Sequence, residues 1–116
     1  MGSTLDRNVV YKTFAEEAVT VDATAGGVQL TDATFRPVLA DDMGVVTEAR
    51  VATIKNVGAD IRVTLDGTTT VTASVGFLVP DGGSIEVWGI DDIANLRAIR
   101  TGAVSSIITA MYARAH

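Results

Sequence analysis

Alternation of apolar and polar positions is clearest in the stretch 49–79. Residues 61, 63 and 65 are apolar and alternate with polar residues, and Asp66-Gly67 then forms a turn dipeptide. Positions 71, 73, 75, 77 and 79 are again apolar or small, on the same parity. A period of two is the repeat of a strand with one buried face and one wet face. We therefore expect 61–79 to form a β-hairpin that supplies one face of a core.

The rest of the chain reads as short extended segments separated by turn residues. Glu16-Glu17 interrupts the first of these segments, and Pro37 pushes another toward a sheet edge. Asp91-Asp92 opens a stretch that we expect to form one helical turn near residues 91–95, with an aspartate as its cap. Besides the two arms of the hairpin, strands are expected at 9–14 with its continuation 18–21, which count as one, and at 35–39, 45–57, 84–89, 96–100 and 104–113. Turns are expected at 25–27, 41–44, 56–60, 80–83 and 101–102.

Seven or eight short strands, with a turn signal about every ~10 residues, are typical of an all-β fold. We expect a single-domain antiparallel β-sandwich or jelly-roll-like barrel. The 116 residues are enough for one core without disulfide staples, which matters because the chain has no cysteine. We assign residues 9–116 to this domain and residues 1–8, which are polar, to a flexible N-terminal arm.

The last expected strand, 104–113, is apolar on both faces. Ile108 and Tyr112 share one face, and Ile107 and Met111 share the other. A strand of this kind is either central in its sheet or covered by a partner. In the 84–89 strand, Trp88 falls on the face opposite Ile85 and Val87. The candidate interface or ligand contacts are therefore Trp88, Tyr112, Met111 and Ile107.

Two interpretations of Trp88 and Tyr112 stay open at this point. Aromatic side chains can pack in a core or in a subunit interface, which suits a chain with only one Trp and two Tyr. Exposed on a sandwich face, the same rings can instead stack on sugar rings. The first interpretation is the simpler one.

The residue types needed for catalysis are scarce. Without cysteine, and with His116 as the only histidine, a zinc site and a Ser-His-Asp or Cys-His triad have no candidate residues. The pairs Asp41-Asp42 and Asp91-Asp92 lack the regular alternate spacing of a calcium loop, and turn formation or helix capping explains them. We expect no catalytic residue, no metal, no cofactor and no enzymatic activity.

Charge and hydropathy narrow the set of partners. Nine Lys and Arg against 14 Asp and Glu give a net charge of −5, with no basic run. Nucleic-acid binders neutralise phosphates with Lys and Arg, so we expect no nucleic-acid partner. The apolar runs are too short for a membrane span and the N-terminus lacks the pattern of a signal peptide, so we expect no membrane partner and synthesis in a cytoplasm.

A series of motifs carries a resemblance to a known group of proteins. The strand 61–65 is followed by Asp66-Gly67-Thr68-Thr69 and Thr72-Ala73-Ser74-Val75-Gly76, then by Asp81-Gly82-Gly83, Asn95-Leu96-Arg97-Ala98-Ile99-Arg100-Thr101-Gly102 and a final strand at 104–112. Together with 21–28, this order resembles small virion proteins of tailed phages. The resemblance covers most of the chain from residue 21 onward. That family usually has a proline between the threonines, whereas here three threonines precede Val71.

The resemblance implies a non-enzymatic structural protein of a tailed-phage virion. A capsid decoration (cement) protein, assembled in the host bacterial cytoplasm, is the first expectation. Its implied partners are further copies of itself, with a trimer favoured, and a major capsid protein, on which the arm 1–8 would dock. A tail or head–tail connector component stays open. The hairpin tip is also similar to sandwich domains appended to chitin-degrading enzymes, which implies a carbohydrate- or host-surface-binding module with Trp88 as its platform.

Overall fold

The structure is a computed structural model that describes residues 11–37 and 48–115. The expected arm at 1–8, the turn expected at 41–44 and His116 lie outside the described residues. The elements, in chain order, are β1 (Tyr11–Val21), α2 (Asp32–Phe35), β2 (Val51–Val57), β3 (Ile61–Thr64), β4 (Phe77–Val79), β5 (Ser84–Trp88), α3 (Ile90–Asn95), β6 (Arg97–Arg100) and β7 (Ser106–Ala115).

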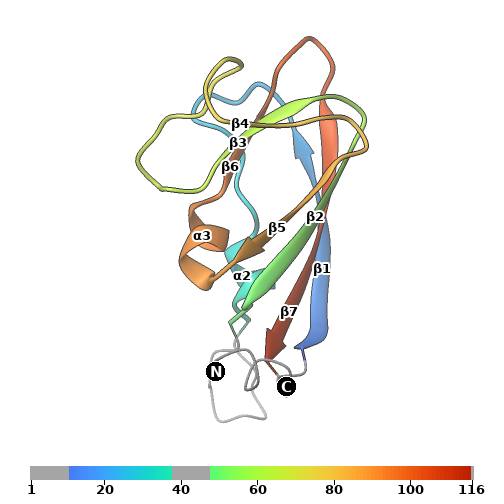
Figure 1. The fold of residues 1–116 in the computed structure, drawn as a ribbon, viewed down its shortest axis with the longest axis vertical. Helices are drawn as coiled ribbons and strands as arrows, with labels where there is room; N and C mark the ends of the chain where they lie inside the picture. Colours follow the sequence, from blue (N-terminus) through green and yellow to red (C-terminus); the bar gives the residue numbers. More distant parts are fainter. Residues whose placement is uncertain (1–10, 38–47, 116) are drawn as a thin grey trace, which may run out of the picture.

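The strands form two antiparallel sheets, which confirms the expected all-β fold and favours the sandwich over the barrel (Figure 1). A four-stranded sheet has the order β1-β7-β2-β5, and a three-stranded sheet has the order β4-β3-β6. The described residues hold seven strands, in agreement with the expected seven or eight. The last strand, β7, is central between β1 and β2. Its inner apolar face is buried in the core, whereas its outer apolar residues Ile107 and Met111 stay exposed.

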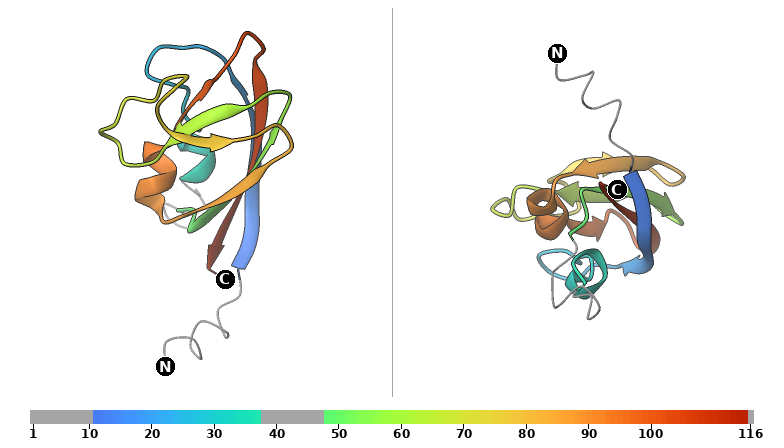
Figure 2. Two further views of the ribbon diagram at one scale, coloured as in Figure 1. Left: turned by 45° about the horizontal axis from the view of Figure 1, so that its top comes forward. Right: turned by 90° about the horizontal axis from the view of Figure 1, so that it is seen from below.

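The four-stranded sheet is longer than its partner, and two kinds of element cover its inner face. The three-stranded sheet covers one end, while α2 and α3 cover the other from the same side (Figures 1 and 2). Phe35 of α2 lies against Tyr112 with ring centroids 5.8 Å apart, and Ile93 of α3 is fully buried. The inward residues of β2 and β7, such as Ile54 and Ile108, complete one continuous core.

The connection 56–60, expected as a hairpin, instead crosses from one sheet to the other. Asn56 is fully buried at the crossing, and its side-chain amide donates to the carbonyl oxygens of Ala59, Val79 and Pro80 at 2.8, 3.1 and 3.1 Å. The Ser106 hydroxyl donates to the Asn56 side-chain oxygen. One side chain thus satisfies the backbone of two crossing loops, and this makes an inter-sheet arch possible where the local pattern suggested a turn.

The second arm of the expected hairpin, 71–79, is strand only at Phe77–Val79. The Asp66 carboxylate accepts from the backbone N–H groups of Thr68 and Thr69 at 3.0 and 2.9 Å, and a second turn closes between Thr72 and Val75. These side chains offer the backbone local partners, which compete with a sheet ladder. Residues 66–76 therefore form a loop.

Val71 anchors that loop although it lies outside the main core. It is 1% exposed, and a Cβ added to Gly27, which has φ +86°, would lie 2.6 Å from its side chain. Arg62 donates to the carbonyl oxygen of Gly76 at 3.0 Å on the same side. The expectation that 71–79 forms one continuous strand is therefore wrong.

Three further expectations are corrected. The interruption at Glu16-Glu17 is absent, because β1 runs through it with only a register shift between Thr13 and Ala15. Of the extended edge segment expected at 35–39, Phe35 instead ends α2 with its side chain buried, and residues 38–39 lie outside the described residues. The helix near 91–95 exists, but Gly89 occupies its cap position without a side-chain hydrogen bond, and the two aspartates lie in its first turn.

Candidate functional site

The outer face of the four-stranded sheet is the candidate interaction surface. Both helices and the three-stranded sheet lie on its other side (Figure 2). Strand registers arrange its side chains in four rows across the sheet. From the helix end upward, the rows are Trp88-Val51-Ala113-Thr13, Glu86-Thr53-Met111-Glu16, Ser84-Lys55-Thr109-Ala18 and Val57-Ile107-Thr20.

One end of this face is aromatic. Trp88 is 52% exposed, and its ring meets that of Tyr11 edge-on, with centroids 5.6 Å apart and an interplanar angle of 84°. Val51, between them on the sheet, is only 6% exposed. We call Tyr11, Val51 and Trp88 the aromatic end. An edge-to-face pair of this kind holds both rings in place and leaves much of their apolar area open to a partner.

The opposite end of the face is aliphatic. Val57 and Ile107 are direct cross-strand partners and are 55% and 50% exposed. We call them the aliphatic end. Between the two ends lie the polar middle rows, in which Met111, 43% exposed, is the main apolar residue. An apolar face broken by threonines and charges is more typical of an interface than of a core.

Of the four residues singled out from the sequence, three lie on this face and one does not. Trp88, Met111 and Ile107 share it, as their parity along β5 and β7 requires. Tyr112 points the other way and is fully buried, so it is a core residue. The expectation that it contacts a partner or ligand therefore does not fit its position.

The Tyr112 hydroxyl links two strands inside the core. It donates to the Glu17 carboxylate at 2.6 Å, and that carboxylate also accepts from the backbone N–H of Thr31 at 3.1 Å. Burial, together with the negatively charged acceptor, raises the pKa of Tyr112 well above its usual range. Glu17 thus ties β1 to β7 and to the start of α2.

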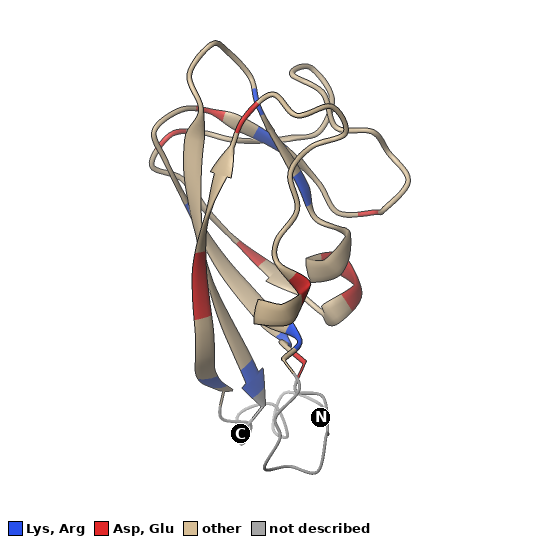
Figure 3. Cartoon of the chain, turned by 180° about the vertical axis from the view of Figure 1, so that it is seen from behind, with Lys and Arg blue, Asp and Glu red and all other residues tan. Residues whose placement is uncertain are grey.

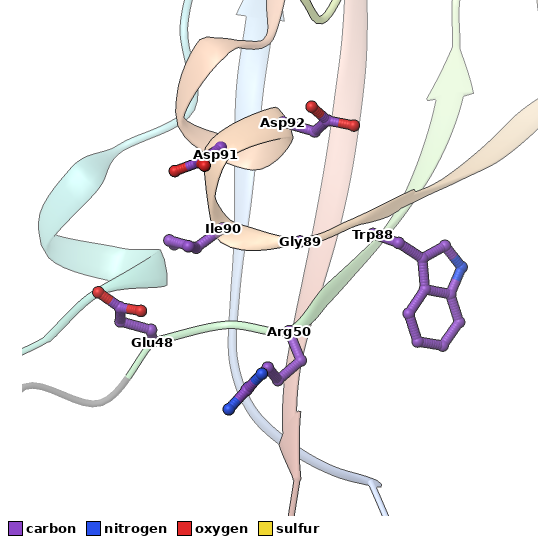
Figure 4. A pocket seen from close by; sticks show the side chains of 7 residues that line it. All are labelled: Glu48, Arg50, Trp88, Gly89, Ile90, Asp91 and Asp92. Carbon is purple, nitrogen blue, oxygen red and sulfur yellow. The ribbon is translucent and has the colours of Figure 1, made fainter. Parts of the chain in front are cut away.

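A polar pocket of about 410 Å³ lies beside the aromatic end, between β5 and α3 (Figure 4). Its lining residues are Glu48, Arg50, Trp88, Gly89, Ile90, Asp91 and Asp92. Figure 4 shows the indole of Trp88 at the rim, directed away from the two aspartates. An exposed ring beside charged and hydrogen-bonding groups can hold a polar, ring-shaped ligand.

A second hollow, the apolar groove, opens between the two sheets. It has a volume of about 360 Å³ and is lined by Val63, Leu65, Phe77, Ile85 and Glu86. Phe77, on the edge strand β4, is 66% exposed, the largest value among the exposed large hydrophobic residues described. The sequence analysis placed Phe77 on the buried face; it does pair with Val63 and share the parity of Val79, but on the edge strand β4 it stays exposed. Tyr11 was not singled out from the sequence.

The described residues offer little for catalysis or metal binding. Within residues 11–37 and 48–115, no three His, Cys, Asp or Glu side chains gather as a metal site, and no helix is long and apolar enough to cross a membrane. Figure 3 shows the described Lys and Arg residues spread over both sheets. The pKa of Asp66 is lowered to about 2, mostly by the hydrogen bond from the Thr69 side chain and next by the one from the Thr69 backbone.

No protein-family model, curated protein or solved structure matches the chain. The functional interpretation therefore depends on the geometry of the outer face and on the motif resemblance given above. The geometry fits a protein that binds other molecules through a sheet face. The resemblance concerns which assembly such a protein would belong to.

Proposed function

We propose that this chain is a non-enzymatic structural protein of a tailed-phage virion, with capsid decoration as its most specific role. The outer face of the four-stranded sheet is the observation that carries the proposal. It exposes Trp88, Ile107 and Met111 on one side of a sheet whose other side is filled by the protein's own core. The motif resemblance supports the assignment to a phage particle.

Two separate apolar ends suit assembly into a symmetric oligomer. In a cyclic oligomer of three or more subunits each subunit uses two different patches, one for each neighbour, and a closed ring satisfies both. The aromatic and aliphatic ends can serve as these two patches, or one of them can contact a major capsid protein. The threonine and charged residues between them suit contacts that form only in the assembly.

Static light scattering tests the self-association part of this proposal. The wild-type chain is expected to form a homo-oligomer, a trimer on the resemblance given above, and Ile107→Ser is expected to shift it toward monomer. Val104→Ser is the matched control, because Val104 is 63% exposed but lies outside the strands. A wild-type chain that is monomeric at high concentration, or a control variant that dissociates equally, would contradict the proposal.

Carbohydrate binding is the second candidate, because a specific observation favours it. The half-exposed ring of Trp88 lies at the rim of the polar pocket, near Arg50 (Figure 4). Sugar rings stack their apolar faces on aromatic residues, and their hydroxyl groups accept hydrogen bonds from an arginine and donate to carboxylates. A host-surface glycan would be the expected ligand.

A glycan array with the wild-type chain and Trp88→Ala separates this candidate from the first. Since Trp88 is largely exposed, the variant is expected to keep its fold, which circular dichroism checks. Binding of defined glycans that disappears in the variant would support the carbohydrate module. An array without signal for the wild-type chain would reject it.

A further inference from the structure

The edge strand β5 presents free backbone groups. Within residues 11–37 and 48–115, β5 pairs only with β2. The N–H of Gly89 donates to Arg50 and the carbonyl oxygen of Gly83 accepts from Asn56, at 2.8 and 2.9 Å. In an antiparallel ladder the N–H and C=O of alternate residues point the same way. Ser84, Glu86 and Trp88 therefore direct their N–H and C=O groups outward.

The apolar groove lies directly beside this edge. Ile85, which faces inward on β5, forms one wall, and Val63, Leu65 and the exposed Phe77 form the rest. A strand added to β5 would place every second side chain on the inner side of the sheet, next to Ile85. The groove offers apolar space at that position.

The negative charge of Glu86 on β5 favours some pairing segments over others. Glu86 is exposed, and within residues 11–37 and 48–115 its carboxylate forms no ion pair with a Lys or Arg. On an added strand, the residue opposite Glu86 would lie on the outer face, where a Lys or Arg is favourable. A second copy would pair β5 with β5, and the register with the largest overlap would set two Glu86 carboxylates opposite each other.

We propose that β5 is a docking edge for an extended segment of a different protein, in which apolar residues alternate with basic ones. Main-chain hydrogen bonds to Ser84, Glu86 and Trp88 supply binding, the apolar groove selects the inward side chains, and Glu86 selects the basic residue. The overall charge of −5 attracts such a segment as well. This edge borders the outer face, with which it shares the side chain of Glu86, and the proposal does not depend on the phage assignment.

Nuclear magnetic resonance titration of the full chain with a capped peptide, Thr-Val-Lys-Val-Lys-Val-Thr, tests the proposal. We expect saturable shifts of the Ser84, Glu86 and Trp88 amide resonances and slower hydrogen exchange at those amides. Glu86→Lys is expected to weaken this peptide about tenfold and to strengthen binding of the Thr-Val-Glu-Val-Glu-Val-Thr peptide. The matched control, Glu16→Lys, makes the same charge change on β1, the other edge strand of that sheet, and is expected to change both affinities much less than Glu86→Lys, through net charge alone.

Phe77→Ser tests the groove separately, because its side chain is mostly exposed and the variant is expected to fold. It should weaken the lysine peptide several-fold without moving the site of the shifts. The proposal is overturned if the wild-type chain shows no saturable shifts at millimolar peptide, or if the shifts fall on β1 or another surface. Equal affinity of Glu86→Lys and wild type for the lysine peptide would overturn it as well.

Discussion

Replacing Asn56 tests the account of how the two sheets are joined. The side chain lies in the crossing between β2 and β3 and is fully buried. Its two N–H bonds are shared among three carbonyl oxygens, and its oxygen accepts from Ser106. In Asn56→Ala these groups lose this partner at once, and a methyl group cannot replace it. The Pro80 carbonyl oxygen still accepts from Gly83, and the Ser106 hydroxyl can still donate to Val57, so the loss falls mainly on the carbonyl oxygens of Val79 and Ala59.

The expected cost follows from the number of buried groups left without a partner. A buried donor or acceptor that loses its hydrogen bond costs about 1–3 kcal/mol, and here one carbonyl, that of Val79, is buried while two are partly open to water. We expect Asn56→Ala to lower the free energy of unfolding by about 3–5 kcal/mol. That is a large part of the ~5–15 kcal/mol that stabilises an ordinary domain.

Urea unfolding followed by tryptophan fluorescence measures this loss. With a slope of about 1–3 kcal/mol per molar urea, the midpoint should fall by about 2 M. Gln29→Ala, at an exposed position, is the control and should change the stability by less than about 0.5 kcal/mol. A loss below about 1 kcal/mol for Asn56→Ala would refute the reasoning, because it would mean that water or the backbone replaces the amide.

Two more predictions concern single contacts. Tyr112→Phe should lower the free energy of unfolding by about 1–2 kcal/mol near pH 7, since it removes the donor to Glu17. Burial raises the pKa of Tyr112 above its ordinary 10.0, so the wild type loses stability as the pH rises past 10. The difference between the two proteins in urea unfolding should therefore shrink there, and a constant difference would count against this pairing. Gly27→Ala should destabilise the fold more than Gly82→Ala, because both glycines have positive φ but only the Cβ at Gly27 would clash with Val71; equal thermal shifts would contradict the packing of that loop.

The strands with clear alternation were predictable from the sequence. In β5, parity separated the face of Val87 from the face of Trp88 and left open which of the two is inward; the structure buries Val87 and exposes Trp88. In β7 the two apolar faces were separated correctly, since Ile108 is buried and Ile107 is exposed. Burial on one face of a strand imposes a period of two, so these elements carry their own signal.

What the sequence did not reveal depends on partners far apart in the chain. Asn56 has the pattern of a turn residue, and its distant acceptors, the carbonyl oxygens of Val79 and Pro80, show only in the structure. Glu17 likewise has the pattern of a break in β1, and its hydrogen bond from Tyr112 shows only in the structure. Val71 keeps the parity of a strand but is buried by a loop on the outer side of the three-stranded sheet. Three of the four residues singled out from the sequence lie on the candidate site. Parity shows which residues share one face of a strand, but it does not show which face the rest of the chain covers.

Cryo-electron microscopy of the phage particle proposed to carry this chain tests the central claim most directly. The account predicts symmetric copies of the sandwich on the head, with the outer face of the four-stranded sheet, including Trp88 and Ile107, buried against neighbouring subunits or the capsid. Absence of the chain from purified particles would contradict the assignment to a virion. Copies on the particle with this face open to solvent would contradict the proposed role of the face.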